Sequence, residues 1–209
     1  LVYLNVKVNQ VIRADANDPN SAITDKKPLP NINVLLRENK TPIQMMTNAN
    51  GNAFREIHYD SSYFVIAVAP GLLNASKTFN TIDARDEKNP IKTINVEINL
   101  DRPYTGKEVL ISDIFYDLDQ WNIRKDAEKP LNELVQLLKD NPRIKIQLSS
   151  HTDCRGTDSY NAELSNKRAK SAVDYLINNG IVTERLVPKG FGETQIEKKC
   201  ACEQCSEEE

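Results

Sequence analysis

The feature that most constrains the fold is residues 143–180, where a strand pattern gives way at a glycine to a helix pattern. Residues 143–150 (RIKIQLSS) alternate apolar and polar side chains, which predicts a strand with one buried face. Gly156 allows a turn that a residue with a Cβ would resist. We expect a helix over residues 159–178 after this turn, so the segment predicts a strand, a tight turn and a helix in that order.

The ends and the buried face of this helix can also be located from the sequence. Thr157 or Asp158 can cap its start, because a short side-chain oxygen accepts the free N–H groups of the first turn. Gly180 is suited to end it. The positions that follow the i, i+3, i+4, i+7 rule, and so form the expected buried stripe, are Ala169, Ala172, Val173 and Leu176.

Two oppositely charged side chains flank the turn. Asp153 precedes Gly156, and Arg168 lies about two helical turns into the helix. The start of a helix favours negative charge, and the planar guanidinium of Arg168 suits a carboxylate. Asp153 can accept hydrogen bonds from an ammonium group. The pair therefore predicts a site for a zwitterion, such as the side-chain end of meso-diaminopimelate. The alternative is that Asp153 and Arg168 pair with each other or cap backbone.

Residues 151–169 (HTDCRGTDSYNAELSNKRA) resemble the binding signature of OmpA-like domains, which hold the peptide stem of peptidoglycan. The resemblance extends from about Val109 to the end of the chain. It implies that Asp153 and Arg168 hold the diaminopimelate group, that Asn161 lies at the helix start, and that Leu164 and Ala169 line the site. The ligand-binding residues expected on this basis are Asp119, Thr152, Asp153, Gly156, Asn161, Leu164, Arg168 and Ala169.

Residues 109–124 also resemble the family, because they read as its opening strand followed by a helix start. Asp119 then falls at the rim of the site, with Tyr116, Asp117 and Leu118 nearby. A solvated turn is the alternative for Asp117 and Asp119. The apolar stripe of the following helix consists of Ala127, Leu131, Leu134, Val135 and Leu138.

Proline residues set the expected limits of that helix. Pro130 would remove a hydrogen bond inside a helix, so we expect regular helix only from about Lys129, with its end at Asn141-Pro142. Residues 184–193 resemble the third strand of the family and its Gly-aromatic-Gly-Glu turn. The sequence then departs from the family pattern, so we expect the domain to be truncated at its C-terminal end, which would expose a sheet edge.

The first hundred residues predict a different kind of domain. Short alternating runs are separated by turn-rich breaks, which favours an antiparallel β-sandwich. The order is similar to carboxypeptidase-regulatory-like domains, on the basis of Leu29-Pro30, Asn50-Gly51, Tyr63 and Pro70-Gly71. Such domains act as spacers or interaction modules. We therefore expect an α+β chain with a β-sandwich over residues 1–102, a linker near 101–106, and a βαβαβ OmpA-like domain over 107–209. Its mixed sheet should carry the helices on one face.

Composition excludes some functions. The net charge of −3 argues against a nucleic-acid surface, which needs clustered positive charge. No apolar run approaches the length that crosses a bilayer. The chain begins at Leu1 without a signal-like segment, so we expect it to be a fragment of a longer precursor.

The four cysteines are Cys154, Cys200, Cys202 and Cys205, and two disulfides among them allow three pairings. The resemblance implies a Cys200–Cys205 disulfide in the loop after the third strand and a second between Cys154 and Cys202. One alternative is a structural zinc site of four thiolates. Another is a nucleophilic Cys154 with His151 as its base.

The function that the resemblance implies is non-covalent binding of diaminopimelate-containing peptidoglycan stems. It would anchor a periplasmic or outer-membrane assembly of a Gram-negative bacterium, with outer-membrane proteins as further partners. We expect no enzyme activity, cofactor, catalytic metal or nucleic-acid partner. The alternatives are an assembly module with a degenerate pocket and a fragment of a wall-processing enzyme.

Overall fold

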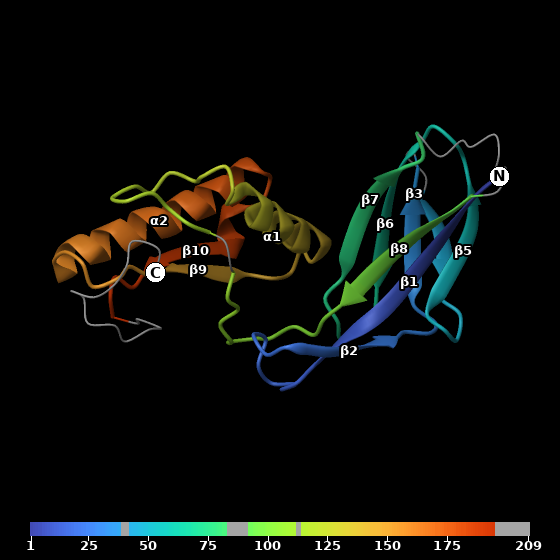
Figure 1. Cartoon of the computed structure of the whole chain (residues 1–209), viewed down its shortest axis with the longest axis horizontal. Coiled ribbons are helices and arrows are strands. Elements are labelled where there is room, and N and C mark those ends of the chain that lie inside the picture. The colour runs from blue at the N-terminus through green and yellow to red at the C-terminus, as the bar shows by residue number, and fades with distance from the viewer. Residues whose placement is uncertain (39–41, 83–91, 112–113, 195–209) are drawn as a thin grey trace. The chain divides into compact units, whose positions relative to one another are not determined.

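The chain divides into two compact units, Leu1–Leu110 and Ile111–Glu209. The computed structural model describes residues 1–38, 42–82, 92–111 and 114–194 (Figure 1). The division falls just after the predicted linker at 101–106. Each unit has a hydrophobic cluster of its own.

The described part of unit 1 consists of strands in two sheets. In the first sheet, one edge of β1 pairs with β2 and β5, and its other edge pairs with β8. The second sheet has the strand order β4-β3-β6-β7. The strands are β1 (Val2–Arg13), β2 (Ile23–Pro28), β3 (Asn33–Arg37), β4 (Pro42–Met46), β5 (Asn52–Ile57), β6 (Ser62–Val68), β7 (Ala75–Asn80) and β8 (Lys92–Leu100).

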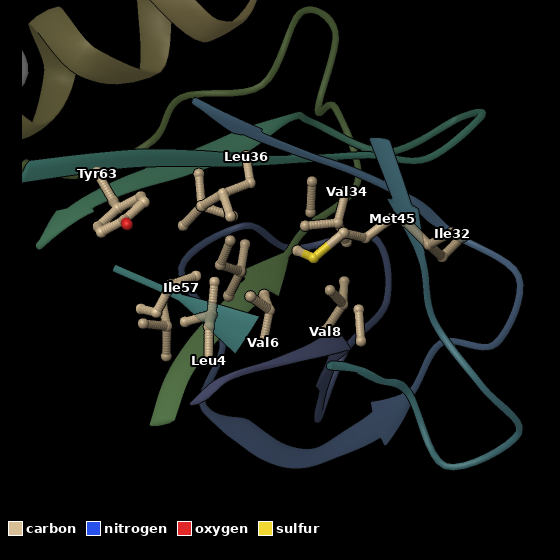
Figure 2. Packing of buried hydrophobic residues seen from close by; sticks show 14 of the residues in the cluster. Leu4, Val6, Val8, Ile32, Val34, Leu36, Met45, Ile57 and Tyr63 are labelled. Atoms are coloured by element: carbon tan, nitrogen blue, oxygen red, sulfur yellow. The ribbon is translucent and has the colours of Figure 1, made fainter. Parts of the chain in front are cut away.

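Alternating side chains of both sheets form the core of unit 1. Val2, Leu4, Val6 and Val8 of β1 are buried, while the residues between them point away. Figure 2 shows residues of β1 opposite Val34 and Leu36 of β3. Removing these apolar surfaces from water is the main force that holds the two sheets together. The expected antiparallel sheets are confirmed.

One strand pair differs from that expectation. β1 and β8 run parallel, in register from Val2 opposite Lys92 to Gln10 opposite Leu100. Parallel neighbours need a long connection, because the chain must return to the same end of the sheet. The strands β2 to β7 supply that connection here. Alternation reports which face of a strand is buried but not its direction, so this pairing could not be read from the sequence.

Unit 2 combines two helices with a small sheet. Its described elements are α1 (Glu128–Asp140), β9 (Ile146–Ser150), α2 (Asp158–Asn178), a short 3₁₀ helix η1 (Thr183–Arg185) and β10 (Leu186–Gly190). β9 and β10 pair in parallel, from Ile146 opposite Leu186 to Ser150 opposite Gly190. Among the described residues, neither helix is long and apolar enough to span a membrane.

Both helices pack on one cluster with this sheet. Leu131, Val135 and Leu138 of α1 meet Leu148 of β9 and Leu176 of α2 there. Pro130 is the third residue of α1, so it falls in the first turn, where a missing N–H costs nothing. The limits predicted for both helices agree with the structure to within about two residues, and the α+β class is confirmed.

The strand predicted around residues 109–116 is not formed by the described residues of that segment. A strand needs partners for its backbone groups along a neighbouring edge. The Leu110 amide instead donates to Asn20 Oδ1 at 2.8 Å, and Val109 and Leu110 are exposed. Residues 109–111 and 114–116 therefore follow an irregular path.

Candidate functional site

The candidate site is built where β9 ends and α2 begins. Gly156 has φ +106°, a conformation that L side chains rarely adopt, and a Cβ there would lie 3.2 Å from Tyr160 Cδ1. Thr157 caps the helix, because its Oγ1 accepts a hydrogen bond from the Tyr160 N–H at 3.3 Å. The predicted turn and cap are both present, and they fix the direction of the first turn of α2.

Arg168 projects from α2 toward the irregular segment before α1. Its Nε donates to the Gln120 carbonyl at 2.9 Å and Nη2 donates to the Asp117 carbonyl at 3.3 Å. Its guanidinium carbon lies 5.0 Å from the centre of the Tyr116 ring. In return, the Tyr116 hydroxyl donates to the Arg168 carbonyl at 3.1 Å. These contacts hold the guanidinium in one orientation.

Arg168 is partly buried and carries no carboxylate partner among the described residues. Burial lowers its pKa, and the nearby Tyr116, Asp153, Tyr160 and Asp119 act in the opposite direction. An arginine stays charged under these conditions. N–H groups that its two backbone acceptors do not use are therefore available to a carboxylate.

Asp153 is already paired with a neighbour that the sequence did not single out. Arg155 approaches its Oδ2 with Nη2 at 2.5 Å and Nε at 2.8 Å, and the Arg155 amide donates to Oδ1 at 2.9 Å. Partial burial acts to raise the pKa of Asp153, but these hydrogen bonds and the charges of Arg155 and Arg168 outweigh it. The pKa of Asp153 therefore lies below its usual value, and the group is a carboxylate at neutral pH.

Asp119 is the second acidic group beside Arg168. It adopts φ +54°, in the left-handed region, and is exposed. Its Oδ1 accepts a hydrogen bond from the Tyr160 hydroxyl at 2.7 Å, and this bond raises the pKa of Tyr160. The structure thus brings both Asp119 and Asp153 within range of the charge of Arg168.

The remaining predicted residues lie around this group in less exposed positions. Asn161 is buried, and its Nδ2 donates to Glu193 Oε2 at 2.5 Å. The Thr152 amide donates to the Gly192 carbonyl at 3.0 Å, while its buried Oγ1 has no hydrogen-bond partner among the described residues. Leu164 and Ala169 are buried on α2, so they offer a ligand little surface. Their roles as lining residues stay predictions.

Several residues of the site were missed by sequence reasoning. Arg155, Tyr160 and Glu193 each hold a predicted residue, and the Gln120 carbonyl holds Arg168. Two of them had a signal in the sequence through their positions. Arg155 is two residues after Asp153, and Tyr160 lies in the first turn of the helix. Glu193 and Gln120 lie in segments that resemble the family, but their contacts with Asn161 and Arg168 depend on the fold and could not be seen in the sequence.

Most of the cysteines lie outside the described residues. Cys154 is the one within them, and it is not a free thiol. The pairings Cys200–Cys205 and Cys154–Cys202, like the alternative zinc site, depend on residues outside that part and stay predictions. His151 stacks on Phe191, with ring centres 5.2 Å apart.

A hollow in unit 1 does not coincide with this site. It measures about 400 Å³ and is lined by Arg37, Tyr63, Phe64 and Phe79 among others. None of the residues predicted to bind a ligand lies in it. The candidate site is therefore identified by its charged and polar side chains at the start of α2, and not by the presence of a cavity.

Comparison with known proteins shows which family the sequence of unit 2 matches. Residues 115–208 match the OmpA family. The chain is 35% identical over 92 residues to the peptidoglycan-associated lipoprotein of Brucella melitensis, covering 44% of this chain and 55% of that protein. It is 32% identical over 91 residues to outer membrane protein A of Serratia marcescens, covering 43% of this chain and 25% of that protein.

A solved structure is also similar to part of this chain. The peptidoglycan-associated lipoprotein of Burkholderia pseudomallei is 25% identical, with a TM-score of 0.41, over 42% of this chain and 75% of that one. The chain spans about half or less of the length of the first curated relatives that it matches.

Proposed function

Because residues 115–208 form an OmpA-like domain, we propose that this chain binds the peptide stems of peptidoglycan without making or breaking a bond. The ligand group is the zwitterionic end of diaminopimelate. Arg168 binds its carboxylate, and Asp153 and Asp119 accept hydrogen bonds from its ammonium group. The chain thereby anchors an assembly of the Gram-negative envelope to the cell wall, and outer-membrane proteins are its expected partners.

The observation that carries this proposal is the state of Arg168. Its guanidinium is oriented by two backbone carbonyls and the Tyr116 ring, yet no carboxylate among the described residues forms an ion pair with it. A partly buried guanidinium without a hydrogen-bonded carboxylate is less stable than one that is paired. A ligand carboxylate removes that cost, and a guanidinium already held in place loses little freedom on binding.

The name of a relative supports the same class of ligand. The Brucella melitensis protein is described as peptidoglycan-associated, and it matches 92 residues of this chain. We also propose that Cys154 forms a disulfide with a cysteine near the C-terminal end, because it is not a free thiol. Such a bridge would restrain the loop that carries Asp153.

Retention of the protein on purified sacculi tests the proposal. We expect wild-type protein to sediment with sacculi, and Arg168→Lys and Asp153→Asn to lose most of that retention. Lysine keeps the charge but lacks the planar fork that binds a carboxylate with two parallel bonds. Lys170→Ala is the matched control, because it removes a cation from the exposed face of the same helix.

Each outcome of this experiment has a definite meaning. Far-ultraviolet circular dichroism and the fluorescence of Trp121 must first show that the variants fold. If folded Arg168→Lys and Asp153→Asn variants are retained like wild type, the site assignment is wrong. Release of soluble fragments from the sacculi would instead indicate a wall-processing enzyme.

One observation favours a second candidate function. Asp153 is occupied by Arg155, as expected of a pocket that no longer binds its ligand. In that case the chain is an assembly module, with unit 1 as its main interaction surface. Calorimetry with a diaminopimelate peptide separates the two, because a degenerate pocket would give no heat of binding.

A further inference from the structure

The segment that follows β8, residues 101–110, belongs to unit 1 and is fastened to it. At its start, the Asp101 carboxylate forms an ion pair with Arg13 of β1, with Oδ2 and Nη2 2.9 Å apart, and both side chains are mostly buried. In its middle, the Lys107 amide donates to the Tyr104 carbonyl at 3.3 Å and closes a turn. The segment that the sequence predicts to be a linker is therefore folded at its start and in its middle.

At the end of this segment, one side chain bridges two backbone groups. Asn20 lies in the loop between β1 and β2 (Figure 1), and its Nδ2 donates to the Glu108 carbonyl at 3.0 Å. Its Oδ1 accepts a hydrogen bond from the Leu110 amide at 2.8 Å. Asparagine suits this position because its side chain offers both a donor and an acceptor, as the backbone of a neighbouring strand does. These two hydrogen bonds form the Asn20 clasp.

The loop that carries Asn20 is itself held in place. The Asn20 amide donates to Asp18 Oδ1 at 2.8 Å, and the Ser21 hydroxyl donates to the Asp18 carbonyl at 2.9 Å. A longer hydrogen bond of 3.4 Å, from Arg102 Nη1 to the Ala16 carbonyl, joins the same loop to the segment near its start. The clasp therefore connects the segment to a loop whose own conformation is fixed.

We propose that the Asn20 clasp keeps residues 101–110 from acting as a free tether between the two units, and that its opening releases them. Unit 2 begins at Ile111, directly after the clasped Leu110. A closed clasp therefore leaves no separate spacer between the units. Ten residues pulled out straight span at most about 35 Å, so an open clasp adds a tether of that length.

The clasp is suited to open before the rest of unit 1. Both of its hydrogen bonds are exposed to water, so each contributes little net stability. A load applied through unit 2 reaches the end of β8 only through this segment, because the segment follows Leu100 directly. The segment is thus a reserve of length that is drawn out before the hydrogen bonds between β1 and β8 are loaded. This role does not depend on which ligand unit 2 binds.

Hydrogen exchange of the Leu110 amide measures the clasp directly, because Asn20 Oδ1 is its acceptor. In the full chain, we expect Asn20→Ala to speed this exchange about fivefold or more, since two exposed hydrogen bonds are lost. Asn20→Asp keeps the acceptor but not the donor, so its Leu110 amide should exchange more slowly than that of Asn20→Ala. Asn17→Ala is the matched control, because Asn17 is an exposed asparagine of the same loop whose side chain makes no hydrogen bond among the described residues.

Nitrogen-15 relaxation on the same proteins tests the release of the tether. In wild type, the amides of residues 102–110 should be as ordered as those of β1. In Asn20→Ala they should gain motion on the picosecond to nanosecond timescale, and the two units should tumble more independently. The amides of β1 must keep their wild-type protection in every variant, which shows that unit 1 stays folded.

Each result either supports or overturns the proposal. Faster Leu110 exchange and a mobile segment in Asn20→Ala, with neither in Asn17→Ala, support it. Equal Leu110 exchange in wild type and Asn20→Ala would show that the clasp does not hold the segment. Faster exchange in a segment that stays as ordered as β1 would show that other contacts hold it, and the tether would then not be released by this clasp.

Discussion

Gly190 lies where one added carbon would collide with the backbone of α2. A Cβ there would come within 2.6 Å of the Ser165 carbonyl carbon and 2.5 Å of Ser165 Oγ, and it would also meet the Asn166 nitrogen. We expect Gly190→Ala to destabilise unit 2 by about 1–3 kcal/mol, as overpacking does. Urea unfolding followed by Trp121 fluorescence measures this change. The neighbouring Lys189→Ala should unfold near the wild-type midpoint, and a wild-type midpoint for Gly190→Ala would contradict the packing.

Glu38 makes the stability of unit 1 depend on pH. A hydrogen bond from Ser61 and the contact with His58 hold the pKa of Glu38 below its usual value, although burial opposes them. A carboxylate whose folded pKa is lowered stabilises the fold above the unfolded pKa, and this contribution is lost as pH falls through the folded value. We therefore expect acid to destabilise unit 1 less in Glu38→Gln than in wild type, in urea titrations from neutral pH to pH ~3. Glu56→Gln, at an exposed position of β5, is the control, and equal pH dependence in all three proteins would refute the expectation.

At the scale of a single element, the start of α2 links stability to the site. Thr157 caps this helix through Tyr160, which also holds Asp119. We expect Thr157→Ala to cost about 1 kcal/mol, and Thr157→Ser to restore most of it because the hydroxyl remains. Trp121 fluorescence during urea unfolding measures both. Equal losses in the two variants would show that the hydroxyl does not cap the helix.

The elements also show how far the sequence alone could predict this fold. The limits of α1 and α2 could be predicted, because caps, proline and apolar spacing act within a few residues. The parallel pairing of β8 and the absence of a strand at residues 109–111 and 114–116 could not be predicted, because they depend on which distant partner a backbone meets. The residues of the site also fall into those that local sequence could predict and those that depend on distant partners. Asp153 and Arg168 lie in a local motif, whereas the Gln120 carbonyl that orients Arg168 arrives from a separate segment.

At the scale of the whole molecule, each unit carries its own core. Leu138 is fully buried in the cluster of unit 2, and Leu36 is fully buried in that of unit 1. We expect Leu138→Ala to lower the stability of unit 2 by about 2–5 kcal/mol, through lost burial and the cavity left behind. Trp121 is the single tryptophan of the chain, so its fluorescence reports that loss directly. Leu36→Ala should leave the Trp121 transition in place, and a shift of equal size would show that the two units unfold as one.

The parallel alignment of β1 and β8 determines how unit 1 would respond to tension. Because both strands run the same way in register from Val2 and Lys92 to Gln10 and Leu100, the start of β1 and the end of β8 lie roughly 30 Å apart. Pulling on these two points would load the hydrogen bonds between the strands together, in shear, rather than opening them one after another. Unit 1 is therefore suited to transmit a mechanical load along its length without unravelling.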